Sequence, residues 1–520
     1  MHDLLQAMGR EVVRQESTAE PGRRSRLWAS KDVFHVLGKN TDWANPEEVE
    51  GTMQKTKRSA WNTGVFSKMS RLRLLRIRNA CFDSGPEYLS NELRFLEWCN
   101  YPTKSLPSSF QPENLVEVHL CYSNLRQLRL GNKILDSLKV IDLSYSEYLI
   151  KTPDFTGIPN LERLILEGCR RLSEVHSSIG HHIKLIYVNL IDCKCLTSLP
   201  SRISGLNLLE ELHLSGCSKL KEFPEIEGNK KCLRKLCLDQ TSIEELPLSI
   251  QYLVGLISLS LKDCKKLSRL PSSINGLKSL KTLHLSGCSE LENLPENFGQ
   301  LECLNELDVS GTAIREPPVS IFSLTNLKKL SFHGCAESSR STTNIWQRLM
   351  FPLMPRKRAT STSLVLPSLS GLSSLTKLDL SNCNLGEGAV PNDIGYLSSL
   401  RHLDLSSNKF VSLPTSIDQL SGLQYLRMED CEMLQSLPQL PPNLQLFSIN
   451  GCTSLEKMQF SSNLCKFNYP SFSFINCWRL SESDCWNNMF HTLLRKCFQV
   501  SLSISLSLKT CTLCCRALLI

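Results

Sequence analysis

The stretch that decides the fold reads NLERLILEGCRRLSEVHSSIGHHI (160–183), KLIYVNLIDCKCLTSLPSRISGLN (184–207) and LLEELHLSGCSKLKEFPEIEGNKK (208–231). Each copy holds the pattern L-x-x-L-x-L, with Val in place of one Leu in the second copy, and then a cysteine three residues later. Most copies continue with a Leu-Pro pair and an isoleucine. A fixed period of this length means that one supersecondary unit is repeated along the chain.

The apolar positions of the pattern share one face of a short strand. They are Leu161, Leu164 and Leu166, then Leu185, Val188 and Leu190, then Leu209, Leu212 and Leu214. A single copy cannot bury this face alone, so neighbouring copies must stack. The period and the consensus are the leucine-rich-repeat signature. The predicted fold class is an α/β repeat, a leucine-rich-repeat solenoid of horseshoe form with short parallel strands on the concave face, preceded by a small helical remnant.

The 23 cysteines do not indicate a disulfide framework. Nine of them take the same slot, three residues after the last apolar position of a strand, where other copies use Thr241, Thr312 or Asn408. A small, half-polar side chain in that turn can pack inward and bond the neighbouring backbone. We therefore expect reduced thiols and a cytoplasmic or nuclear location. The nine are Cys169, Cys193, Cys217, Cys264, Cys288, Cys335, Cys383, Cys431 and Cys452.

The charge and hydropathy of the chain argue against nucleic acid and membrane as partners. The net charge of +8 is spread over 520 residues, and no basic run with interleaved aromatics indicates a nucleic-acid groove. The first residues, MHDLLQAMGREVVRQE, do not form a signal peptide, and no run of eighteen apolar residues occurs. We expect no nucleic-acid ligand and no transmembrane segment.

The remaining chain divides by pattern. Residues 1–17 place Met1, Leu4, Leu5, Met8, Val12 and Val13 on one helical face, and a second short amphipathic piece follows at 31–37. We expect a helical remnant at 1–40, a polar linker at 41–69, about seventeen repeats at 70–462 with a basic insertion at 336–362, the start of a post-repeat domain at 463–498, and a low-complexity tail at 499–520.

Three motifs together resemble one family. Met1-His2-Asp3 is followed by LLQAMGREVVRQES and PGRRSRLW, the repeats have the forms L-x-L-x-x-C and L-P-x-x-I, and FINCWRL stands at 474–480. This combination resembles the intracellular nucleotide-binding leucine-rich-repeat immune receptors of plants, in the class with an N-terminal Toll/interleukin-1-receptor domain. The resemblance implies that residues 1–40 end a nucleotide-binding module and that FINCWRL opens the domain after the repeats.

The resemblance also implies a cofactor site. In this family the histidine of the first motif contacts the phosphate of bound ADP, so that role falls to His2, with Asp3 supporting it. The sequence has no G-x-x-x-x-G-K-[ST] phosphate loop, no Toll-type domain stands before Met1, and VEGTMQKTKRSAWNTG (49–64) lacks the family's apolar strand. We therefore expect no cofactor and no enzyme activity, and a fragment, truncated gene product or short isoform of such a receptor.

The candidate recognition surface is the set of outward positions between the strand leucines. These positions vary between copies whereas the leucines do not, as a recognition surface on a rigid scaffold requires. The candidate partner-binding residues are Glu211, His213, Ser215, Lys235, Asp239, Lys262, His284, Asp308, Lys329 and His333. We expect these positions to face solvent. A His/Asp metal or acid–base site in this column is the alternative, but solvent exposure explains the polar residues without chemistry.

Two functions remain open. One is the recognition and autoinhibition region of a plant immune receptor, whose partner is a pathogen effector, a guarded host protein or the receptor's own nucleotide-binding domain. The other is an intracellular protein-binding scaffold without an immune role, or a truncated regulatory isoform of such a receptor.

Overall fold

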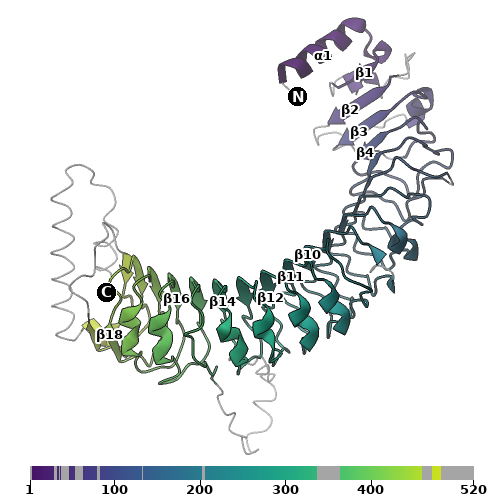
Figure 1. The fold of residues 1–520 in the computed structure, drawn as a ribbon. Coiled ribbons are helices and arrows are strands. Elements are labelled where there is room, and N and C mark those ends of the chain that lie inside the picture. The colour runs from purple at the N-terminus through teal and green to yellow at the C-terminus, as the bar shows by residue number, and fades with distance from the viewer. Residues whose placement is uncertain are drawn as a thin grey trace, which may run out of the picture. The chain divides into compact units, whose positions relative to one another are not determined.

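The structure is a computed structural model that describes residues 3–28, 32–33, 35–36, 46–52, 63–78, 82, 84–131, 133–201, 205–335, 363–459 and 471–481. The chain divides into two compact units, Met1–Ile243 and Glu244–Ile520. In both units short parallel strands lie side by side in chain order (Figure 1). The predicted leucine-rich-repeat solenoid is confirmed.

The first unit begins with the helix α1 (Asp3–Glu16) and the 3-10 helix η1 (Pro21–Arg23). Its strands pair in the order of the chain, with each one parallel to the next. They are β1 (Arg26–Leu27), β2 (Glu48–Thr52), β3 (Leu74–Arg78), β4 (Phe95–Trp98), β5 (Glu117–His119), β6 (Val140–Asp142), β7 (Arg163–Ile165), β8 (Tyr187–Asn189), β9 (Glu211–His213) and β10 (Lys235–Cys237). The 3-10 helices η2 (Thr63–Lys68) and η3 (Ser177–His181) lie in the connections.

The second unit continues the same plan. Its main strands are β11 (Ser258–Ser260), β12 (Thr282–His284), β13 (Glu306–Asp308), β14 (Lys329–Ser331), β15 (Lys377–Asp379), β16 (His402–Asp404), β17 (Tyr425–Arg427), β19 (Leu446–Ser448) and β21 (Ser471–Ser473). On the side away from these strands lie the 3-10 helices η5 (Leu248–Tyr252), η6 (Ser272–Gly276), η7 (Phe298–Gln300), η8 (Val319–Ser323), η10 (Asn392–Tyr396) and η11 (Thr415–Gln419) (Figure 1). A two-stranded sheet of β18 (Ser436–Gln439) and β20 (Lys457–Gln459) and the helix α4 (Trp478–Ser481) complete the unit.

The strand leucines form the core, as the pattern predicts. Leu161, Leu185 and Leu209, with the other apolar positions of their copies, are all buried. The Leu-Pro-x-x-Ile motif closes the other side, because proline with its fixed φ precedes a 3-10 turn. The carbonyl of Pro247 accepts a bond from the backbone N–H of Ile250, and the Ile250 side chain is fully buried.

The cysteine slot connects each repeat to the one before it. All nine slot cysteines are buried and free. Cys193 and Cys217 donate their thiol hydrogens to the carbonyl oxygens of Leu166 and Leu190, each with a sulfur–oxygen distance of 3.2 Å. Burial raises the pKa of Cys217 to about 12, so the thiol keeps the proton that it donates. The expected role of this slot is therefore what the structure shows.

Two predicted boundaries are wrong. The polar segment 41–69, predicted as a linker, contains β2, which pairs with β3 along five residues. Val49 is buried in the core between two charged neighbours. The alternation of polar and apolar residues is too short here to predict a strand from the sequence. At the other end, β21 pairs with β19, and the Cys477 thiol bonds the carbonyl of Ile449 at 3.1 Å. FINCWRL therefore continues the repeat ladder as far as the described residues reach.

The 48-residue gap between the repeats beginning at 326 and 374 adds no strand to the sheet. Lys329 of β14 pairs directly with Lys377 of β15, and the next residues follow in register. The irregular unit counted as a repeat therefore does not take part in the pairing of β14 with β15. The insertion 336–362 itself, most of the post-repeat segment and the tail 499–520 lie outside the described residues.

The helix α1 confirms the first amphipathic segment, but the described side chains of its apolar face are covered only in part. Leu5, Met8 and Val12 are exposed, and Val13 is buried. The second predicted piece is described only at 32–33 and 35–36, which are helical.

Candidate functional site: the outward rows of the parallel strands

Parallel pairing in register aligns the outward side chains into rows. We call the first and third residues of each three-residue strand, and the residue two positions further on, the first, third and fifth rows. In the first unit the first row contains Glu117, Val140, Arg163, Tyr187, Glu211 and Lys235, and the third row contains His119, Asp142, Ile165, Asn189, His213 and Cys237. The sequence period alone therefore brings these side chains together.

The predicted residues of the first unit do lie together, but not all face solvent. Glu211 and Lys235 pair in the first row, and the Ser215 hydroxyl donates to the Asp239 carboxylate at 3.2 Å in the fifth row. His213 is different, because its side chain is only 10% exposed. Its Nε2 lies 2.8 Å from a Glu211 carboxylate oxygen, and its ring packs at 5.5 Å from the ring of Tyr187.

The expectation that His213 faces solvent is therefore wrong. The third row is recessed because the first and fifth rows flank it, and Asn189 and Ser260 in the same row are buried as well.

The predicted residues of the second unit form separate pairs. His284 and Asp308 are neighbours in the third row, with Nδ1 4.0 Å from a carboxylate oxygen. Lys329 makes an ion pair with Glu306 at 3.0 Å. His333 Nδ1 lies 2.7 Å from the Ser381 hydroxyl, and Lys262 is exposed. The contacts of His284, Lys329 and His333 are therefore local and separate, and these residues do not form one cluster.

The structure does not test the predicted cofactor residues. His2 lies outside the described residues, and Asp3 is exposed at the start of α1. The absence of a cofactor stays a prediction.

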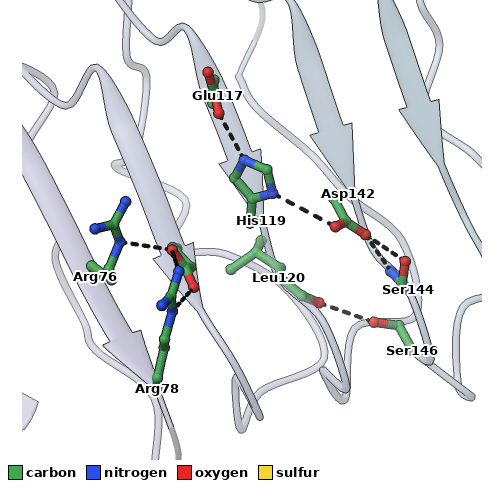
Figure 2. A network of polar contacts seen from close by, with 9 residues as sticks. Arg76, Arg78, Glu117, His119, Leu120, Asp142, Ser144 and Ser146 are labelled. Carbon is green, nitrogen blue, oxygen red and sulfur yellow. Dashed lines mark hydrogen bonds and ion pairs between the residues drawn. The ribbon is translucent and has the colours of Figure 1, made fainter. Parts of the chain in front are cut away.

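A polar network on β3 to β6 was not predicted from the sequence (Figure 2). Glu97 on β4 is 9% exposed at its side chain and lies between two arginines of β3. Arg76 donates from Nε to its carboxylate at 2.8 Å, and Arg78 donates to both of its oxygens. Burial opposes ionisation of Glu97, but Arg78 and Arg76 outweigh it and hold the pKa below its usual range.

His119 on β5 continues this network along the third row. Its Nε2 lies 2.9 Å from Glu117, and its Nδ1 lies 3.6 Å from Asp142 on β6 (Figure 2). Asp142 also accepts bonds from the backbone N–H and the hydroxyl of Ser144, at 3.0 and 2.5 Å. The signal was present in LRLLRI, LRFLEW, LVEVHL and LKVIDL, whose outward positions carry charges of alternating sign.

We expect the stability of the first unit to depend on pH through His119. Burial of the ring lowers the pKa of His119, but its bonds to Asp142 and Glu117 outweigh burial, so the pKa is raised above 6.5. Protonation therefore stabilises the fold. The contribution is complete below pH 6.5 and is lost as pH rises through the folded-state pKa. Urea midpoints measured across this range should fall with rising pH in the wild type and less in His119→Gln. Equal slopes would contradict the assignment.

Two other features are absent from the described residues. No three His, Cys, Asp or Glu side chains in this part of the chain are grouped to hold a metal ion. Within the same residues, no helix has the length and hydropathy needed to cross a membrane.

The fold and the rows define the class of protein, a leucine-rich-repeat protein that presents side chains from a parallel sheet. Residues 205–301 match the family model "Disease resistance protein RPS4B-like, leucine-rich repeats", and 374–397 and 399–420 match the general leucine-rich-repeat model. A solved Toll–Spätzle complex from Drosophila shares the fold at 15% identity and a TM-score of 0.53, over 84% of this chain and 53% of that one.

Curated plant disease resistance proteins are then similar to this chain over most of its length. It is 41% identical over 461 residues to TMV resistance protein N of Nicotiana glutinosa, covering 88% of this chain and 38% of that protein. It is 36% identical over 501 residues to RPP2B of Arabidopsis thaliana, covering 93% and 39%. The predicted resemblance to these receptors is confirmed. The chain spans about two-fifths of the length of these relatives.

Proposed function

We propose that this chain is the recognition and autoinhibition region of an intracellular plant immune receptor, and that its outward rows bind a protein. The observation that supports this is the contrast between rows. Leu164, Val188 and Leu212 face the core in register, whereas Arg163, Tyr187 and Glu211 beside them differ in charge and shape. A rigid ladder of this kind can change its ligand without changing its core.

The ligand that these rows fit is a protein surface of mixed charge. Arginines and tyrosines, which are enriched among the residues that dominate binding energy, alternate with carboxylates and histidines over neighbouring strands. A pathogen effector, a guarded host protein or the receptor's own nucleotide-binding domain would each present such a surface. A cytoplasmic location and the absence of catalysis by this chain belong to the same proposal.

A non-immune protein-binding scaffold would use the same rows. The two functions differ in what a row substitution does inside a complete receptor. In a scaffold it changes binding only, whereas in a receptor it changes the defence response as well.

We therefore expect Glu211→Lys, Lys235→Glu and Asp239→Lys together to alter receptor output without unfolding the protein. The three residues lie on the surface, where a substitution usually costs within about 0.5 kcal/mol, and the lost bonds of Glu211 to His213 and of Asp239 to Ser215 add to this. The chain should be joined to the N-terminal domains of a relative and expressed in leaves. The expected result is loss of ligand-triggered cell death or constitutive cell death, in a protein that still unfolds cooperatively.

The matched control reverses the same number of charges outside the rows, at Lys221→Glu, Glu222→Lys and Glu225→Lys. All three side chains are exposed in the same unit. If the control changes the response as much as the row variant, or if neither does, recognition does not lie in the rows.

A further inference from the structure

Each repeat has a turn just after its fifth-row residue where the backbone enters the left-handed region. Six of these turns hold glycine, and most others hold Asn or Asp, as expected for positive φ. The occupants in chain order are Asn100, Tyr122, Tyr145, Gly168, Asp192, Gly216, Gln240, Asp263, Gly287, Gly311, Gly334, Asn382, Ser407, Asp430, Gly451 and Asn476. Two consecutive repeats thus place tyrosine where the backbone disfavours a bulky side chain.

Tyr122 has φ of 58° and Tyr145 has φ of 59°. A bulky residue in this region carries strain, and such strain persists where the surroundings or the function require it. Core packing does not require it here, since Tyr122 is 56% exposed and Tyr145 is 39% exposed. The two aromatic rings are therefore held on the surface at a conformational cost.

The rings form an ordered stack. Their centroids are 4.9 Å apart and their planes differ by 9°. The ring of Tyr145 lies over Gly168 of the next repeat, where a Cβ atom would come within 2.4 Å of it. Its hydroxyl donates to Glu167 at 2.5 Å, and the other Glu167 oxygen accepts from Asn189 at 3.2 Å. Tyr145 is fixed from the side of Gly168, and Tyr122 ends the stack.

The surroundings of the stack favour a cation. Glu167 and Asp192 both act on the Tyr145 hydroxyl, with Glu167 as the larger influence, and the pKa of Tyr145 is raised to about 12. The same unit already stacks guanidinium groups on its rings, since Arg163 lies 4.2 Å from the ring centre of Tyr187 and Arg76 lies 4.9 Å from that of Phe95. A guanidinium is planar and stacks on aromatic faces better than an ammonium does.

We propose that the Tyr122–Tyr145 stack is a docking point for an arginine side chain of a protein partner, whose guanidinium stacks on Tyr122, while the carboxylates of Glu167 and Asp192 beyond Tyr145 make the surroundings negative. This surface is the turn at the strand ends and lies outside the predicted recognition residues. It rests on the proposed function only in that the partner is a protein. It adds arginine selectivity, which the rows do not predict.

The test uses the whole chain and a fluorescent peptide of alternating arginine and serine, with lysine and glutamate peptides of the same length. Binding is measured by anisotropy at low salt. We expect the arginine peptide to bind about fivefold more tightly than the lysine peptide, as one exposed cation–π contact provides. Since the two peptides have equal charge, the general attraction of carboxylates cancels in this ratio. Equal affinities would overturn the proposal.

Variants then locate the preference. Tyr122→Asn removes the ring and suits the left-handed backbone, because Asn100 and Asn382 occupy equivalent turns. We expect it to abolish the arginine preference, while Tyr122→Phe keeps it. The control is Tyr148→Asn, since Tyr148 is 49% exposed in the same unit and is not a member of the stack. Preference retained in Tyr122→Asn, or lost in Tyr148→Asn, would show that arginine binds elsewhere.

The two proposals can fail separately. The row variant at Glu211, Lys235 and Asp239 leaves the stack intact, so it should keep the arginine preference even where it changes receptor output. A normal response in the row variant with an intact arginine preference would contradict only the proposed function of the rows.

Discussion

Replacing Leu212 by Asp should unfold a run of repeats in the first unit. Leu212 is 2% exposed, and its neighbours in register are Val188 on β8 and Leu236 on β10. Truncation of a buried leucine already costs about 2–5 kcal/mol, and a carboxylate placed there without a partner adds a desolvation cost. We expect the free energy of unfolding to fall by at least about 4 kcal/mol. The measurement is urea unfolding followed by circular dichroism, in which the part of the signal that reports the first unit should already be lost without urea.

The adjacent residue provides the control for this effect. Glu211 precedes Leu212 on the same strand but points outward. Glu211→Gln should therefore change the free energy of unfolding by less than about 0.5 kcal/mol. Leu212→Met, which conserves volume, should cost less than about 1.5 kcal/mol. A folded Leu212→Asp protein with an unchanged transition would mean that this strand does not bury its leucine.

Replacing Asn408 by Ala should cost about 3–5 kcal/mol in the second unit. Asn408 is 2% exposed and takes the slot that cysteine holds in most other repeats. Its Nδ2 donates to the carbonyls of Leu380 and Leu405 at 2.9 and 2.8 Å. Its Oδ1 accepts the backbone N–H groups of Cys383 and Leu385 at 3.2 and 3.0 Å. Alanine leaves buried donors and acceptors of two repeats unpaired.

A substitution series separates these bonds from simple loss of volume. Asn408→Cys can donate one bond to the preceding repeat, as Cys431 does to Leu405 at 3.4 Å, but cannot accept the two N–H groups. We therefore expect an intermediate loss for Asn408→Cys. Cys431→Ala removes one weak thiol donor and should cost less than Asn408→Ala. If the alanine variants of Asn408 and Cys431 lose equal stability, hydrogen bonding at Asn408 is not what stabilises that junction.

The fold could be predicted because the residues that repeat with a fixed period are the ones that form the core, and their burial follows from their spacing. Leucines three and five positions into each copy fall on one face, and proline starts the 3-10 turn that buries isoleucine. Prediction failed where the pattern was short. In β2 only Val49 marks the inward face, and in β21 one strand of three residues follows an aperiodic segment. Pairing with a neighbouring strand, which single-sequence patterns do not contain, determines both elements.

The sequence predicts which residues of the candidate site face outward, but not their burial or their contacts. Periodicity identifies Glu211 and Lys235 as outward residues, but not the degree to which neighbouring rows cover His213. The network around Glu97 depends on arginines that lie 19 and 21 residues earlier, in repeats of irregular length. The stacked tyrosines could not be predicted from the sequence, because the dipeptide Tyr-Ser does not indicate a left-handed turn. Their positive φ angles are seen only in the structure.

The left-handed turns also restrict how such an array can change its length. The side chain of one turn leans over the next, so Tyr145, Asp192, Asp263 and Asp430 are each followed by a turn glycine, at Gly168, Gly216, Gly287 and Gly451, where a Cβ would come within 2.4 Å of a neighbouring side-chain atom. Recombination that deletes or duplicates whole repeats preserves the leucine period but changes which turns become adjacent. A crossover that puts a side chain in place of one of these four glycines would force the side chain of the preceding turn to move. Viable length variants should therefore either keep the glycine at such a junction or reorient the two side chains, as Tyr122 and Tyr145 do by stacking.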